Sequence, residues 1–157
     1  MSNNVPQKVI ESKIYEVRGS KIMLDKDLAE LYGVETRTLN QAVTRNRNRF
    51  PQDFTFRLTT DELDNLRSQF VISSWGGTRY PPRAFTEHGI LMLSNVLKSE
   101  RAVKVSIQII RVFNKMREMV QDYRELLKKL RRIETRQDVE SKEIWKAIRM
   151  LQRKVLK

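Results

Sequence analysis

The sequence predicts an α+β fold: a small domain with a helix-turn-helix and short β-hairpins or a wing, followed by a long C-terminal helix that can form a coiled coil. Three observations predict it. β-Forming residues precede position 25, two helical apolar patterns meet at Gly33, and neither Pro nor Gly occurs from residue 99 to the end. The resulting regions are a disordered N-terminus (1–7), a domain (8–118) and a basic helical extension (119–157).

The N-terminal part of the domain favours strands. Residues 9–17 are rich in β-forming side chains, a turn signal follows at 18–20, and the apolar run resumes at 21–24. We expect a short hairpin from this pattern. Asp25 should then cap the next helix, because its carboxylate can accept from free backbone N–H groups.

Residues 25–49 have the pattern of a helix-turn-helix. Apolar side chains recur at helical spacing over 28–32, and Gly33 can adopt the positive φ at which a first helix reverses. Thr36 is the expected cap of the second helix. The inward face of that helix would consist of Leu39, Ala42 and Val43.

The polar face of the second helix carries the candidate DNA contacts. Arg, Asn and Gln can form bidentate bonds with guanine or adenine edges, so an exposed helix that carries them can enter a major groove. Between Thr36 and Gln52 the chain holds four arginines and no acidic residue. An ordinary helical hairpin with a solvated face is the alternative, but such a face normally mixes charges of both signs.

Two roles are predicted for these side chains. The expected base-reading residues are Arg37, Asn40 and Gln41, and the expected phosphate contacts are Arg45, Arg47, Arg49 and Arg79. Thr36 and Thr44 complete the candidate DNA-binding set.

The middle of the domain should return to strands. Pro51 stops the preceding helix, residues 54–58 alternate as in a half-buried strand, and Thr59 or Thr60 opens a helix to about residue 68. Residues 70–72 resemble a further strand. The following segment, 73–82, is either a wing that touches DNA or a surface loop, and it contains Arg79.

Two helices complete the chain. The first begins at Thr86 and Glu87, is the most apolar, and should form the centre of the core. His88 near its start is more readily a packed or capping side chain than a ligand, since no second His or Cys can share a metal. The second helix begins at Ser99, and its first turns should pack on the domain.

Beyond residue 113 the last helix carries an apolar seam. Its members follow alternating spacings of three and four: Phe113, Met116, Val120, Tyr123, Leu127 and Leu130, then Ile144, Ile148, Leu151 and Val155. Polar residues occupy the intervening core positions Glu134, Gln137 and Ser141. This interruption could fix register, bend the helix or split it into two. We expect self-association through the seam, with a basic tail that orders only on DNA as the alternative.

Composition limits the class of protein. The 157 residues carry a net charge of +12, and residues 99–157 hold 17 Lys and Arg against 8 Asp and Glu, which favours phosphate polyanions or anionic surfaces as partners. There is no Cys, one His and no apolar run long enough to span a bilayer. We expect a cytoplasmic protein without metal, cofactor or membrane partner. No set of residues suggests catalysis, so an enzyme is not expected.

Several segments together resemble a known family. The run KIMLDKDLAELYGV (21–34) and the blocks 39–43, 45–46, 49–54, 84–90, 93–99 and 110–113 occur in order over about residues 8–118. They resemble the phage-derived "open reading frame six" N-terminal domain, a member of the KilA-N superfamily. The resemblance implies a small α+β DNA-binding module of phage and bacterial proteins, joined to a variable second region.

Three functions remain in view. The leading hypothesis is double-stranded DNA binding with a sequence preference, as a homodimer, in transcriptional or prophage regulation. The second is a protein-interaction or antirepressor role, in which the C-terminal helix engages a partner protein. The third is RNA binding, because basic charge does not discriminate between duplex types.

Overall fold

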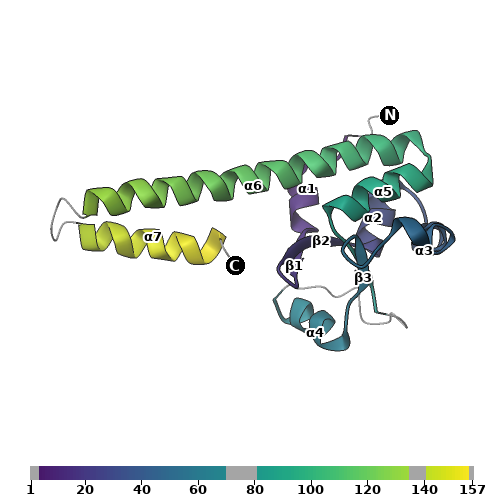
Figure 1. Cartoon of the computed structure of the whole chain (residues 1–157), viewed down its shortest axis with the longest axis horizontal. Helices are drawn as coiled ribbons and strands as arrows, with labels where there is room; N and C mark the ends of the chain where they lie inside the picture. Colours follow the sequence, from purple (N-terminus) through teal and green to yellow (C-terminus); the bar gives the residue numbers. More distant parts are fainter. Residues whose placement is uncertain (1–3, 70–80, 135–140, 156–157) are drawn as a thin grey trace. The chain divides into compact units, whose positions relative to one another are not determined.

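The computed structural model describes residues 4–69, 81–134 and 141–155 (Figure 1). The chain divides into two compact units, residues 1–112 and 113–157. The first unit combines a four-stranded antiparallel sheet with helices, and the long helix α6 (Glu100–Glu134) runs from the first unit into the second. The predicted α+β class is therefore confirmed.

The sheet of the first unit has the strand order β1-β2-β4-β3, with every neighbouring pair antiparallel. The strands are β1 (Tyr15–Val17), β2 (Ser20–Leu24), β3 (Thr55–Arg57) and β4 (Arg83–Phe85). The helical elements are α1 (Gln7–Ser12), α2 (Asp25–Tyr32), α3 (Thr36–Arg45), the 3-10 turn η1 (Arg47–Arg49), α4 (Thr60–Gln69) and α5 (Glu87–Leu97).

The start of the domain differs from the predicted hairpin. Val9 and Ile10, which the sequence places in a strand, lie in α1, where Ile10 is fully buried. Within residues 4–7, where the sequence favours disorder, the N–H of Val5 donates to Oε1 of Gln108 at 3.0 Å. Residues 1–3 lie outside the described part of the chain. Packing against the domain therefore decides the structure of this segment over local preference.

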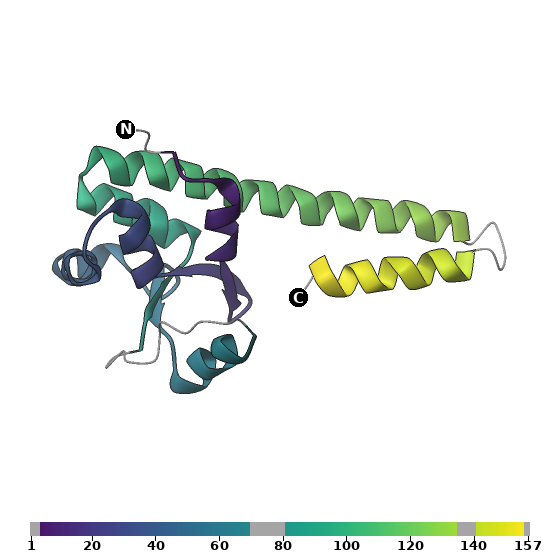
Figure 2. The same cartoon turned by 180° about the vertical axis from the view of Figure 1, so that it is seen from behind.

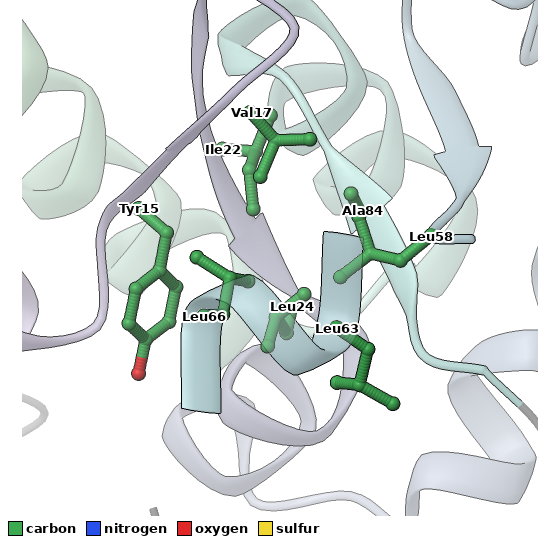
Figure 3. Close-up of a cluster of buried hydrophobic side chains, with 8 residues drawn as sticks. All are labelled: Tyr15, Val17, Ile22, Leu24, Leu58, Leu63, Leu66 and Ala84. Carbon is green, nitrogen blue, oxygen red and sulfur yellow. The ribbon is translucent and has the colours of Figure 1, made fainter. Parts of the chain in front are cut away.

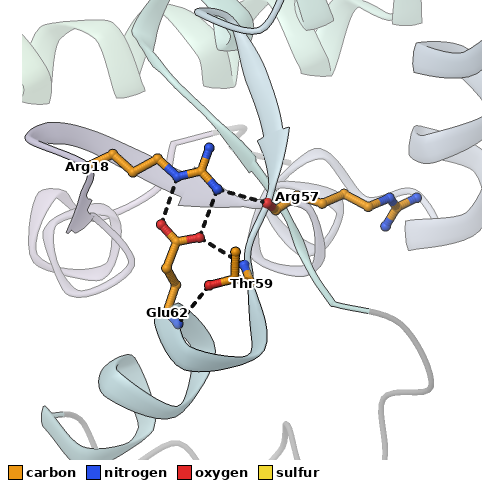
Figure 4. Close-up of polar contacts among 4 residues, drawn as sticks. All are labelled: Arg18, Arg57, Thr59 and Glu62. Carbon is orange, nitrogen blue, oxygen red and sulfur yellow. Dashed lines mark hydrogen bonds and ion pairs between the residues drawn. The ribbon is translucent and has the colours of Figure 1, made fainter.

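The turn between β1 and β2 is as predicted. Arg18 and Gly19 have φ values of 55° and 76°, the left-handed conformation required by a two-residue hairpin loop. Arg18 is held there by Glu62 of α4, whose two carboxylate oxygens accept from Nε and Nη2 at 2.8 and 2.9 Å (Figure 4). Its guanidinium also lies 4.2 Å from the centre of the Phe56 ring.

Helix α4 begins where the sequence predicts. The N–H of Glu62 donates to Oγ1 of Thr59 at 3.1 Å, and the N–H of Thr59 donates to Oε1 of Glu62 at 2.8 Å. This reciprocal pair satisfies two N–H groups that a helix start would otherwise leave free. The helix covers one face of the sheet through a buried cluster of Tyr15, Val17, Ile22, Leu24, Leu58, Leu63, Leu66 and Ala84 (Figure 3).

The other face of the sheet carries α2 and α5. Met23 and Phe85 are paired across β2 and β4 and are fully buried on this face. Helix α5 begins where the sequence predicts, and Oγ1 of Thr86 caps it by accepting from the N–H of Gly89 at 3.4 Å. A Cβ on Gly89 would lie only 2.1 Å from the carbonyl oxygen of Phe54, so glycine permits this close approach.

The second unit contains two helices where the sequence pattern favours one continuous helix. Helix α7 (Ser141–Val155) runs beside the C-terminal part of α6 (Figures 1 and 2). The predicted alternative of a helix split into two is therefore confirmed. Residues 135–140 between them lie outside the described part. The packed side chains are Tyr123, Leu127, Leu130, Trp145 and Ile148. Part of the predicted seam is therefore buried within a single chain.

The ion pair between Arg18 and Glu62 predicts a pH dependence of stability. Hydrogen bonds from Arg18 lower the pKa of Glu62 from about 4.5 to about 2. Because the folded pKa lies below the unfolded one, the stabilisation is present above pH 5 and is lost as pH falls toward 2. We expect Glu62→Gln to flatten the fall of Tm over this range, as measured by circular dichroism.

The matched control is Asp64→Asn, which removes an exposed carboxylate of the same helix that pairs with Arg67 at only 3.9 Å. It should retain the dependence of the wild type. Equal pH profiles for the two variants would contradict the assignment.

Candidate nucleic-acid interface

The turn between α2 and α3 has the predicted glycine geometry. Gly33 has a φ of 72°, its N–H donates to the carbonyl of Glu30, and the N–H of Val34 donates to that of Ala29 at 3.0 Å. This pair of bonds is the Schellman motif, which satisfies helix-end carbonyls and reverses the chain. Only residues 33–35 separate the two helices, so α3 leaves α2 in a fixed direction.

The first turns of α6 hold the end of α2. Nε of Arg101 donates to the carbonyl of Leu31 at 3.1 Å, which satisfies another helix-end group. The hydroxyls of Tyr32 and Ser106 lie 2.7 Å apart in the core, where burial raises the pKa of Tyr32. The helix that precedes the candidate interface is thus supported from a segment about 70 residues away in sequence.

Helix α3 buries one side and exposes the opposite side. Leu39 and Val43 are fully buried, as predicted. At about 100° per residue, Arg37, Gln41 and Thr44 project opposite to these two positions. All three are exposed, and Thr44 donates its hydroxyl to the carbonyl of Asn40 at 3.0 Å. The exposed row has the residue types that contact base edges in a groove.

The predicted caps of both helices are wrong. The capping positions are Leu24 and Glu35, and neither side chain caps its helix. Thr36 is instead the first residue of α3 and is only partly exposed. Asp25, the first residue of α2, is 5% exposed, and its Oδ1 accepts from the N–H of Lys26 at 2.8 Å.

Asn40 does not point freely outward as the sequence predicts. Its Nδ2 donates to Oδ2 of Asp25 at 2.9 Å and to the carbonyl of Thr36 at 3.2 Å. Its Oδ1 is buried and has no hydrogen-bond partner among the described residues. The amide therefore joins α3 to the start of α2.

The arginine-rich segment after α3 is fixed at both ends. Nδ2 of Asn46 donates to the carbonyl of Ala42 at 2.8 Å, and the buried ring of Phe50 packs edge-on against Phe85 with centroids 6.3 Å apart. The arginines on and around this segment are exposed, and none forms an ion pair with another described residue: Arg37, Arg45, Arg47 and Arg49. The ninth candidate, Arg79, and the predicted wing lie outside the described residues.

Two further arginines belong to this surface and were not predicted. Arg57 of β3 and Arg83 of β4 are directly paired across the sheet. The pKa of Arg83 is lowered by burial and by the charges of Arg57 and Arg47, whereas Asp25 raises it. A strand at 83–85 is not expected from the sequence, because three residues beside two prolines give no periodic signal. The pairing that brings these charges together is thus visible only in the structure.

Other site types find little support in the described residues. Within residues 4–69, 81–134 and 141–155, no group of three or more His, Asp or Glu side chains could hold a metal ion. Nor does this part of the chain contain a helix with the length and apolar character needed to cross a bilayer. His88 stacks its ring on Phe54 with centroids 5.6 Å apart.

A sheet that supports two helices joined by a tight glycine turn, with cations exposed on the second, defines the class of small α+β helix-turn-helix domains. The family model of the ORF6N domain matches residues 12–96, more than half of the chain. The chain belongs to the ORF6N family, as the resemblance in its sequence predicts. Comparisons with curated proteins and with solved structures found no match.

The bond between Asn40 and Asp25 should be structural. Asn40→Ala removes a donor to a largely buried carboxylate and should lower the free energy of unfolding by about 1–2 kcal/mol. Urea unfolding would measure it. Gln41→Ala, the exposed neighbour, is the control and should change stability by less than about 0.5 kcal/mol. Equal stabilities of the two variants would show that the bond does not hold α3 in place.

Proposed function

We propose that this ORF6N protein binds duplex DNA by placing α3 in the major groove, as a cytoplasmic, prophage-type transcriptional regulator of the KilA-N superfamily. The observation that carries the proposal is the row of exposed arginines from Arg37 to Arg49, which have no acidic partner among the described residues. Cations without acidic partners, grouped on a helix and on the turn that follows it, are the electrostatic footprint of a polyanion partner.

The side chains divide into two roles on this proposal. Arg37 and Gln41 project from the middle of the exposed row and are suited to base edges. Arg45, Arg47 and Arg49 follow the helix and are suited to phosphates, which set affinity and register. Asn40, which the sequence places among the base readers, acts through Asp25 and keeps α3 in the orientation that this contact requires.

A second proposal concerns self-association. Met119, Leu126 and Ile133 are each more than half exposed and recur every seven residues on α6. They form a row separate from the side chains that pack against α7. A heptad row is the pattern by which helices pair. We propose that two copies associate through this row; the alternative is capture of a helix from another protein by the same row.

Binding as a function of salt tests the DNA proposal. Arg47→Ala should lower the slope of log affinity against log salt by about 0.9, because one phosphate contact is lost. Gln41→Ala should leave the slope unchanged, and it should weaken the preference for particular DNA sequences in a selection from random duplexes. Fluorescence anisotropy with labelled duplex measures both.

Arg67→Ala is the control, since Arg67 lies on α4 across the sheet from α2 and α5. Unchanged slopes for Arg47→Ala would refute this binding mode. Competition with structured RNA decides the nucleic acid: stronger displacement by RNA than by duplex DNA would overturn the proposal in favour of RNA binding.

Light scattering over a range of concentrations tests the dimer. Leu126→Lys should halve the mass of the wild-type species, because a charge in a paired apolar row is desolvated without a partner. Gln121→Lys adds the same charge at an exposed position on the opposite side of α6 and should leave the mass unchanged. A wild-type monomer at all concentrations would overturn the homodimer and favour capture of a partner helix.

A further inference from the structure

A second group of cations lies beside the arginine row, at the end of the sheet. Two of its members lie on the sheet, Arg57 on β3 and Arg83 on β4, and the third is Arg47 on η1, which also belongs to the arginine row. We name the three the sheet-end arginines. Arg57 and Arg83 are direct cross-strand partners, so their side chains leave the same face of the sheet. The charge of Arg47 also contributes to the lowered pKa of Arg83, after burial and the charge of Arg57.

The face can be identified from the strand register. Phe56 and Ala84 are the preceding pair and pack with the α4 cluster. Side chains alternate along a strand, so Arg57 and Arg83 leave the opposite face, which α2 and α5 cover. Figure 4 shows the guanidinium of Arg57 extending away from Glu62, while its carbonyl accepts from Nη2 of Arg18 at 3.4 Å. The acid that neutralises Arg18 therefore does not serve Arg57.

No acid of the described residues pairs with these three guanidinium groups. The carboxylate whose charge reaches Arg83 is that of Asp25, and its oxygens already accept from Lys26 and Asn40. Arg57 donates from Nη1 to the carbonyl of Pro81 at 3.0 Å, which orients the group without neutralising it. Like charges directly opposite each other in a sheet are destabilising when nothing lies between them.

Besides the cross-strand pairing and the lack of a paired acid, the site contains a hydrogen-bond donor without an acceptor. Nε of Arg83 is buried from solvent and has no hydrogen-bond partner among the described residues. A buried donor that loses its water without gaining an acceptor costs free energy, so natural structures usually supply one. An anion held by the three arginines would supply this acceptor and remove the mutual repulsion at the same time.

We propose that Arg47, Arg57 and Arg83 form an anion-binding site that takes a backbone phosphate of duplex DNA, next to the groove contacts of α3. The identity of the anion rests on the proposed function. The guanidinium group matches the geometry of phosphate oxygens, and three of them compensate the charge of a phosphodiester more than fully. Two of the three arginines lie on β3 and β4. A phosphate bound there would therefore fix the position of the sheet on the duplex, as well as that of α3.

Two variants test the site with DNA. Arg83→Gln removes the central charge and the unpaired Nε, and Arg57→Gln removes its exposed partner. Each should weaken binding to duplexes of any sequence on the order of tenfold and lower the salt slope by about 0.9. Arg67→Gln, on α4, is the charge-matched control and should alter neither value.

A second measurement needs no DNA. Inorganic phosphate, compared with chloride at equal ionic strength, should raise Tm of the wild type and of Arg67→Gln more than Tm of Arg83→Gln. A site that serves only the fold would show the same phosphate effect in all three proteins, and that result would overturn the proposal. The proposal would also be overturned if Arg83→Gln had a lower Tm than the wild type but phosphate raised the Tm of both proteins by the same amount.

The two measurements separate the possible failures. If the wild type binds duplex DNA and both variants keep its salt slope, the phosphate site is refuted and the proposed function stands. If the wild type does not bind DNA but phosphate still discriminates between it and Arg83→Gln, the proposed function fails and the anion site stands.

Discussion

The arrangement of α2 and α3 depends on the buried carboxylate of Asp25. It begins α2, where the helix dipole favours a negative charge, and it accepts from the N–H of Lys26 and from Nδ2 of Asn40. One side chain thus anchors the first helix to the second, while its charge also acts on Arg83 of the sheet. The orientation of α3 is set by this polar contact together with the apolar contacts of Leu39 and Val43.

Arginines serve two distinct purposes in the first unit. Arg18 is neutralised by Glu62 and stacked on Phe56, so its charge is used to hold the hairpin turn on α4. The sheet-end arginines and those of α3 and η1 lie on the side that carries α2 and α5, and they lack such partners among the described residues. A protein gains no stability from clustering unpaired cations. Their segregation is therefore the physical ground for expecting a polyanion on that side.

Local features of this fold are predictable from sequence, and non-local ones are not. The reversal at Gly33 and the starts of α4 and α5 follow from neighbouring residues, and each is found as predicted. The inward turn of Asn40 depends on where Asp25 lies, fifteen residues earlier. The pairing of Arg57 with Arg83 depends on strand register across 26 residues. Contacts between residues this far apart in sequence produce no periodic pattern in the sequence from which they could be predicted.

In the second unit, too, the sequence pattern does not determine which helices pack together. The observed packing also limits the surface that is left for a dimer. Its 3/4 apolar pattern fits both a continuous coiled coil and a helical hairpin, and the hairpin buries Trp145, outside the predicted seam, while Leu151 of the seam is half exposed. Trp145 and Ile148 pack on Leu127 within one chain, so that part of the seam is no longer open to a second copy. The remaining heptad row is narrow, and an interface of that size holds copies together weakly. On the proposed function, two half-sites on one duplex would raise the effective concentration of the copies, so that DNA binding and self-association strengthen each other.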